Sequence, residues 1–137
     1  MLGNKNRREK MKPQHTARQF LQSFLDNIRD RVPSVAAVLV CDSDGVVLLK
    51  SSSYQENSLD GTLAAVYATA TQQASKLQFG QNKSVVAWHK DRVIVYVNAT
   101  PFFVSIICSN KESSDVGALL AMVPQIAKAL EPMKDAA

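Results

Sequence analysis

The sequence predicts an α/β protein in which one five-stranded antiparallel sheet lies between two layers of helices. Three segments carry apolar residues at helical spacing and five carry runs typical of strands, in the order helix-strand-strand-helix-strand-strand-strand-helix. The turns within each strand group are short, which makes neighbouring strands antiparallel. The strand segments are apolar on both sides, so both faces of the sheet need cover. A length of 137 residues fits one domain with its own core.

The first and last helices are predicted over residues 16–31 and 115–130. Thr16 can cap the first helix, and Pro33 ends it because a residue before proline avoids helical geometry. Pro124 lies inside the last helix and removes one backbone hydrogen bond, so we expect a kink there. The apolar face of the first helix consists of Phe20, Leu21, Phe24, Leu25, Ile28 and Val32.

The five strands form a hairpin and a three-stranded meander. Asp44 and Gly45 lie between β-branched runs, a combination that strongly favours a tight hairpin turn. Pro101 is tolerated because it comes at the start of a strand. The strands are predicted over residues 35–41, 46–51, 84–89, 92–98 and 102–109.

The middle helix, predicted over residues 62–78 with Gly80 as its left-handed exit, has two unlike faces. The face expected to pack on the sheet consists of Leu63, Val66, Tyr67, Ala70, Ala74 and Leu77. The opposite face carries small residues where a solvent-exposed face usually carries Lys and Glu. Alanine is a good helix former, which explains such a face without a partner, but small residues also let a second helix approach closely. The candidate interface on this helix consists of Ala64, Ala65, Ala68, Thr71, Gln72 and Ser75, with Phe79 just beyond.

Three helices are too few to cover both faces of such a sheet. Five strands span about 24 Å at ~4.8 Å each, whereas a helix covers only about 10 Å. One face receives two helices and the other receives one, so one face is left under-covered. An apolar edge strand without proline or a central lysine aggregates unless it is paired. We therefore predict a dimer that continues the sheet through the strand Ser84, Val85, Val86, Ala87, Trp88 and His89.

The net charge of +4 comes from the amino-terminal residues rather than from the body of the chain. We predict a basic, disordered tail over residues 1–14 and a single domain over residues 15–137. Such a tail is either a solvated terminus or a weak attachment to an anionic membrane or a partner's acidic patch. The body lacks the basic face with interleaved aromatics that nucleic-acid binding requires. No apolar run approaches the ~18 residues of a membrane span, so no membrane insertion is expected.

The sequence lacks the patterns of metal, cofactor and catalytic sites. The turn over residues 42–45 has its glycine too early for a calcium loop, and His15 and His89 have no partner at metal-ligand spacing. Cys41 and Cys108 lie inside apolar runs and are expected to be reduced, buried thiols. We therefore predict a binding protein and no enzyme. A small hydrolase using a cysteine or a serine is the competing hypothesis from another class.

Four segments of the chain resemble a known family. They are residues 32–34, 40–45, 68–77 and 82–85, and the similarity extends over residues 18–134. The element order resembles the roadblock (dynein light-chain) superfamily, with its three α/β/α layers. Within it, these segments resemble the mitogen-activated-kinase scaffold subunits of the Ragulator complex. The basic residues before His15 and the proline at position 124 depart from that pattern.

The resemblance implies a non-catalytic scaffold that forms a heterodimer with a second roadblock subunit through the middle helix and the third strand. It further implies a place on late endosomes or lysosomes, where the complex recruits Rag GTPases in amino-acid signalling to the target-of-rapamycin kinase. Kinases of the MAP kinase cascade are expected partners, and membrane attachment is expected to come from another, lipidated subunit. The alternative within the superfamily is a homodimeric dynein light chain that binds the motor's intermediate chain or cargo.

Overall fold

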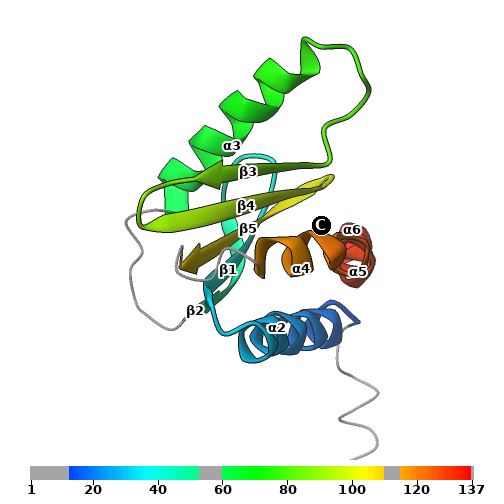
Figure 1. The fold of residues 1–137 in the computed structure, drawn as a ribbon. Coiled ribbons are helices and arrows are strands. Elements are labelled where there is room, and N and C mark those ends of the chain that lie inside the picture. Colours follow the sequence, from blue (N-terminus) through cyan, green and yellow to red (C-terminus); the bar gives the residue numbers. More distant parts are fainter. Residues whose placement is uncertain (1–12, 53–59, 110–114, 137) are drawn as a thin grey trace, which may run out of the picture.

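The structure is a computed structural model that describes residues 13–52, 60–109 and 115–136 (Figure 1). The tail predicted over residues 1–14 therefore lies outside the described residues, except for its last two, which begin the first helix. The predicted α/β fold with a five-stranded antiparallel sheet is confirmed. No helix among the described residues is long and apolar enough to cross a bilayer. The elements are α2 Pro13–Arg31, β1 Val35–Cys41, β2 Val47–Ser52, α3 Asp60–Ser75, β3 Ser84–Trp88, β4 Arg92–Ala99, β5 Phe102–Ser109, α4 Asp115–Ala121, α5 Val123–Ala129 and α6 Glu131–Ala136.

The strands pair antiparallel in the order β2-β1-β5-β4-β3, which places β2 and β3 at the two edges. The β1–β2 turn begins at Asp42, whose carboxylate accepts hydrogen bonds from the backbone N–H groups of Asp44 (2.9 Å) and Val46 (3.0 Å). Gly45 follows with φ +86°, a conformation that glycine adopts at little cost. The predicted hairpin is therefore present, with β2 beginning at Val47, one position later than expected.

The helices cover the two faces of the sheet unequally (Figure 1). α2, α4, α5 and α6 lie on one face, and α3 alone covers the other. Alternate side chains of β1 lie on opposite faces of the sheet. Val38 and Val40 pack in the larger core, whereas Leu39 and Cys41 pack in the smaller core under α3. This alternation explains why the strands are apolar on both sides.

α2 differs from its prediction at its start and at the margin of its apolar face. The helix begins at Pro13 rather than Thr16, because proline is favoured in a first turn, where its missing N–H needs no partner. Leu21 and Leu25 are buried against the sheet, but Phe20 is 62% exposed. Only an arc of roughly 100° faces the core, and Phe20 lies at the edge of the wider arc that the sequence predicted.

The predicted last helix is broken into α4 and α5 rather than kinked, and a further helix, α6, follows beyond its predicted end. Pro124 lies in the first turn of α5, where it lacks the N–H that would continue α4. The chain turns at Met122, whose N–H donates to the carbonyl of Leu119 (3.0 Å). Pro132 lies in the first turn of α6 in the same way. The buried side chains of these helices are Val116, Leu119, Ile126, Leu130 and Met133.

Candidate partner interface

β3 forms an open edge of the sheet. The N–H of His89 donates to the Arg92 carbonyl (2.8 Å), and the N–H of Asn98 donates to the Lys83 carbonyl (2.9 Å). In an antiparallel ladder, hydrogen-bonded pairs alternate along the strand, so the odd-numbered residues of β3 bond to β4. The even-numbered residues direct their N–H and C=O groups away from the sheet. These residues are Ser84, Val86 and Trp88.

The side chains of this edge strand are mainly apolar. Val85 and Ala87 pack against the core under α3, and Val86 packs against the core on the opposite face. Trp88 is 55% exposed, and His89 just beyond the strand is also exposed. An apolar edge with unpaired backbone groups is a template for another strand. The edge position predicted for this strand is therefore observed, and its backbone is available for pairing.

α3 is held on the sheet by a small number of contacts at its centre. The ring of Tyr67 stacks on Phe103 with a centroid distance of 4.4 Å and lies 5.7 Å from the ring of Tyr96. Leu63 is buried one turn earlier. Burial raises the pKa of both tyrosine hydroxyls above the usual value. The α3 layer therefore has an aromatic anchor, with accessible flanks on either side.

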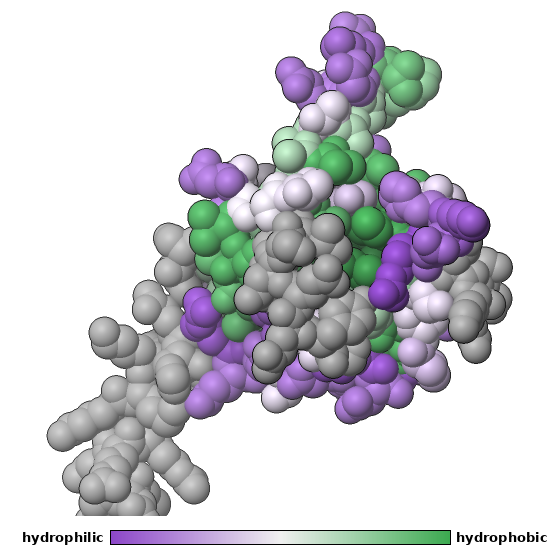
Figure 2. Space-filling view, turned by 90° about the vertical axis from the view of Figure 1, so that its left-hand side faces the viewer, coloured by the Kyte–Doolittle hydropathy of each residue, from purple (hydrophilic) through white to green (hydrophobic). Residues whose placement is uncertain are grey.

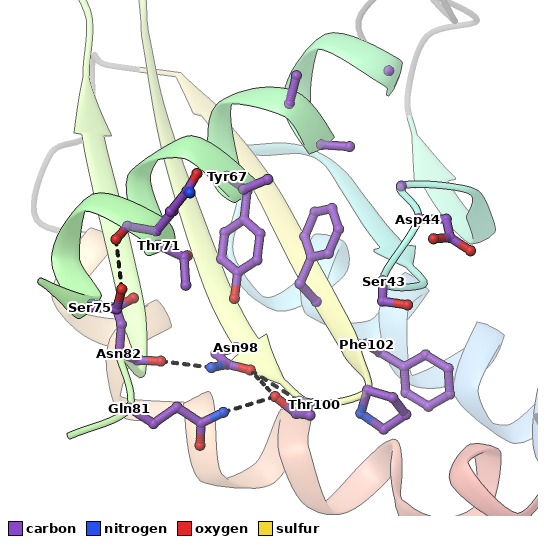
Figure 3. Close-up of a pocket in the computed structure, with 18 residues that line it drawn as sticks. Ser43, Asp44, Tyr67, Thr71, Ser75, Gln81, Asn82, Asn98, Thr100 and Phe102 are labelled. Carbon is purple, nitrogen blue, oxygen red and sulfur yellow. Dashed lines mark hydrogen bonds between the residues drawn. The ribbon is translucent and has the colours of Figure 1, made fainter.

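A cavity of about 750 Å³ lies along one flank of α3 (Figure 3). Its other walls come from the β1–β2 turn, the segment before β3, and the end of β4, the start of β5 and the turn between them; no residue of β3 lines it. The structure thus groups the helical part of the predicted interface on one wall, separate from the strand part. The α3 residues of the predicted interface that line the cavity are Ala64, Ala65, Ala68, Thr71, Gln72 and Ser75.

The rim of the cavity opposite α3 is polar and internally hydrogen-bonded (Figure 3). The side-chain amide of Asn98 donates to the Asn82 carbonyl (2.7 Å), and its oxygen accepts from the Thr100 hydroxyl (2.7 Å). Gln81 donates to the same hydroxyl (3.1 Å). Asp44 is the one charged residue in the described lining. This arrangement suits apolar and amide groups and offers no cluster of acid, base or nucleophile.

The other flank of α3 is more apolar than the sequence predicted. Val66 and Leu77 were expected to face the sheet, yet they are 46% and 63% exposed. α3 ends at Ser75 rather than at residue 78, so Leu77 lies in the turn that follows the helix. Their apolar character and helical spacing gave no reason to separate them from the core residues. Phe79, part of the predicted interface, is 88% exposed. Figure 2 shows hydrophobic side chains at the surface where α3 rises from the sheet.

The described residues offer no support for metal or thiol chemistry. No three metal-ligating side chains gather among them. Cys41 and Cys108 are both buried and form no disulfide, as the sequence predicted. Burial and the nearby Asp115 carboxylate raise the pKa of the Cys108 thiol to about 11. A thiol held protonated in this way is a poor nucleophile. His15 has no described side chain, and His89 lies on the exposed turn after β3.

Comparison with known families matches residues 19–137 to the family described as mitogen-activated protein kinase kinase 1 interacting. The chain is 33% identical to the Ragulator complex protein LAMTOR3 homolog of Dictyostelium discoideum, over 85% of this chain and 89% of that protein. It is 29% identical to Ragulator complex protein LAMTOR3 of Homo sapiens, over 83% of this chain and 92% of that protein.

Solved structures share the fold at lower sequence identity. The gliding protein MglB of Thermus thermophilus superposes with a TM-score of 0.73 at 19% identity, covering 88% of this chain and 93% of that one. A Roadblock/LC7 domain of Streptomyces avermitilis gives a TM-score of 0.62 at 18% identity, covering 82% of this chain and 93% of that one. The three-layer fold is therefore the roadblock fold, as the sequence resemblance implied.

Proposed function

Since the chain belongs to the mitogen-activated protein kinase kinase 1 interacting family, we propose that it is a non-catalytic scaffold subunit of a Ragulator-type complex. The observation that carries this proposal is the open, apolar edge of β3 beside a sheet face covered by one helix. A second subunit that supplies a strand and a helix satisfies both features at once.

The partner in this proposal is a second roadblock subunit in a heterodimer. Its edge strand pairs with β3 through the outward backbone groups, and its helix packs on the small side chains of α3. Two antiparallel edge strands extend the sheet without exposing a new edge at the junction. The exposed Val66, Leu77 and Phe79 add apolar area next to this contact.

The proposed wider assembly is the complex named for the relatives of this chain. The heterodimer recruits Rag GTPases in amino-acid signalling to the target-of-rapamycin kinase, and it binds kinases of the MAP kinase cascade. A lipidated subunit attaches the complex peripherally to late endosomes or lysosomes. The family description supports the kinase contact, and the relatives' names support the complex.

The alternative is a homodimeric dynein light chain that binds the motor's intermediate chain or cargo. The open β3 edge accepts a second copy of itself as readily as a different strand, which is the observation favouring this alternative. Light scattering of the isolated chain separates the two functions. A stable homodimer that does not exchange with a second roadblock subunit supports the light chain, whereas exchange into a heterodimer supports the scaffold.

The interface is tested with Ala68→Arg, which places a charged side chain on the cavity wall of α3. We expect co-purification with the roadblock partner to be lost, because the guanidinium cannot be buried against a helix without a counter-charge. Ala118→Arg is the matched control, since Ala118 is exposed on α4 in the opposite layer. Retained pairing of the Ala68→Arg variant would show that this wall of α3 does not contact the partner.

The cavity wall and the exposed apolar surface outside it are tested separately with Leu77→Arg, since Leu77 is exposed in the turn after α3 and does not line the cavity. If the partner helix packs across the whole helix, both Ala68→Arg and Leu77→Arg weaken pairing. Loss in Leu77→Arg alone moves the contact to the outer flank and leaves the cavity for another ligand. Calorimetric titration with the purified partner measures the difference.

A further inference from the structure

The β2 edge is closed by side chains of α2. The guanidinium of Arg18 donates to the carbonyl of Leu48 (2.9 Å), and the side-chain amide of Gln22 donates to the carbonyl of Lys50 (3.1 Å). These are carbonyls of the edge strand, and another strand would need them as acceptors for pairing. Two α2 side chains therefore occupy the groups that make an edge competent for strand addition.

The spacing of the two contacts follows from the geometry of helix and strand. Arg18 and Gln22 are four residues apart, which is about 6 Å along a helix. Leu48 and Lys50 are two residues apart, which is about 6.7 Å along a strand and brings the same side of the strand outward. A helix lying along an edge can thus cap successive outward carbonyls. Lys50 is opposite Leu39 of β1 in the ladder.

A partly buried polar contact between α2 and β2 holds α2 in the position that this capping requires. Ser51 is buried, donates to the Asp26 carboxylate (2.5 Å) and accepts from the Arg29 guanidinium (3.2 Å). Gln22 also donates to Asp26 (3.2 Å), so the capping amide is itself oriented. At the opposite edge, no side chain among the described residues donates to the outward carbonyls of β3, and the described α2 side chains bond to β2 instead.

We propose that Arg18 and Gln22 determine the specificity of assembly by closing the β2 edge, so that the sheet extends through β3 alone. A sheet with two open edges forms head-to-tail contacts that do not close and grows into chains. A sheet with one open edge stops at a pair. The inference deepens the proposed function, because it takes β3 as the edge that receives the partner.

The test is the double variant Arg18→Met and Gln22→Met in the full-length chain, with and without the roadblock partner. Methionine keeps the length and helix propensity of both side chains and removes both donors. We expect the weight-average mass by sedimentation velocity to at least double as the protein concentration is raised. We also expect amide hydrogen exchange across β2 to slow in the larger species, since a new strand protects its outward N–H groups.

The matched control is Ser23→Met with Asn27→Met, two exposed α2 positions at the same four-residue spacing. This control also introduces two methionines at exposed α2 positions, so larger species in it as well would point to non-specific association. The proposal is overturned if the capping variant keeps the wild-type mass at every concentration, or if its larger species show unchanged exchange in β2. Gln22→Met alone gives the same readout, with a smaller gain in mass, if the double variant is too unstable to purify.

Failure of this inference is distinguishable from failure of the proposed function. Val86→Pro blocks β3 and leaves the α2 contacts in place. If Val86→Pro leaves partner binding unchanged while the capping variant still associates through β2, the edge closure stands and the proposed β3 interface fails. If Val86→Pro abolishes partner binding while the capping variant does not associate, the proposed β3 interface stands and the edge closure fails.

Discussion

β2 and β3 are the two outer strands of one sheet, but their surroundings differ. α2 lies along β2 and its side chains bond to the carbonyls of Leu48 and Lys50 (Figure 1). β3 has no described helix along its edge, and its outward groups belong to Ser84, Val86 and Trp88. The first edge is protected within the chain, whereas the second needs another molecule. The difference shows that the availability of an edge strand for pairing depends on the helices packed beside it as much as on its own sequence.

The strand sequences agree with this division. β2 contains Lys50 and ends in two serines, so it has polar atoms to meet the side chains of α2. β3 contains Val85, Val86, Ala87 and Trp88 in succession and carries no charge. Charged residues and covering elements are common means of protecting an edge, and their absence from β3 agrees with a strand that is buried on assembly.

The largest expected effect comes from Val86→Pro in β3. Proline has no N–H, but the Val86 N–H faces away from β4, so no bond of the existing ladder is lost. We expect affinity for the roadblock partner to fall at least a hundredfold, while the melting temperature of the isolated chain changes little. Calorimetric titration and thermal unfolding measure the two quantities. Val86→Thr, which keeps the branched shape and the N–H, serves as the control.

Gly45→Ala tests the hairpin that positions the closed edge. The new Cβ would lie 2.7 Å from the Cβ of Ala64, and the residue would keep φ +86°. We expect the free energy of unfolding, measured by denaturant titration, to fall by roughly 2 kcal/mol. In Gly61→Ala, where a Cβ meets nothing within 4 Å, stability should rise by up to about 1 kcal/mol. Equal losses in both variants would contradict the close approach of turn and helix.

Ser51→Ala tests the contact that holds α2 against β2. Loss of a buried hydroxyl bonded to Asp26 and Arg29 should lower the free energy of unfolding by about 1 kcal/mol. A double-mutant cycle with Asp26→Ala isolates the coupling between the two groups. Ser43→Ala in the exposed turn is the control, for which we expect no measurable change. Additive losses in the cycle would show that Ser51 and Asp26 do not interact in solution.

The smallest expected effect is the pH dependence of stability that comes from Cys108, in the central strand β5 and away from both edges. The pKa of Cys108 rises from 9.0 to about 11, so the folded chain keeps a proton that the unfolded chain releases. Stability from this group is present below about pH 9 and is lost as the pH rises toward about 11. Denaturant unfolding over this range should show a smaller alkaline loss for Cys108→Ala than for the unmodified chain. Identical pH profiles would contradict the buried thiol.

Much of the fold could be predicted because its signals are local. β1 has the bounds predicted for it, since an apolar run is delimited by Pro33 on one side and the Asp42 turn on the other. The position of β3 at the edge did not follow from its sequence, because an apolar, charge-free strand is equally typical of the centre of a sheet; the strand order places it there. The break at Met122 was missed because a proline inside an amphipathic pattern is compatible with either a kink or a new helix start. The short helix α6 lies beyond the predicted end of the last helix.

The candidate interface was predictable in composition but not in geometry. Small side chains from Ala64 to Ser75 could be grouped on one helix face from their spacing alone. That they line a cavity away from β3, while Val66 and Leu77 remain exposed, depends on the position of α3 on the sheet. That position is set by the packing of Tyr67 on Phe103, which are far apart in the sequence.

The sequence by itself determined the elements, their order and the excess of apolar strand surface over the helices that can cover it. These properties depend on periodicity, turn residues and composition, which act over a few neighbouring positions. Only the tertiary structure decided which edge is closed and which is open. Arg18 meets the carbonyl of Leu48 across 30 positions of sequence, and no local rule predicts that a helix will lie along one edge rather than the other. The physical reason is that edge protection is a contact between layers, and such contacts exist only once the helix has packed on the sheet.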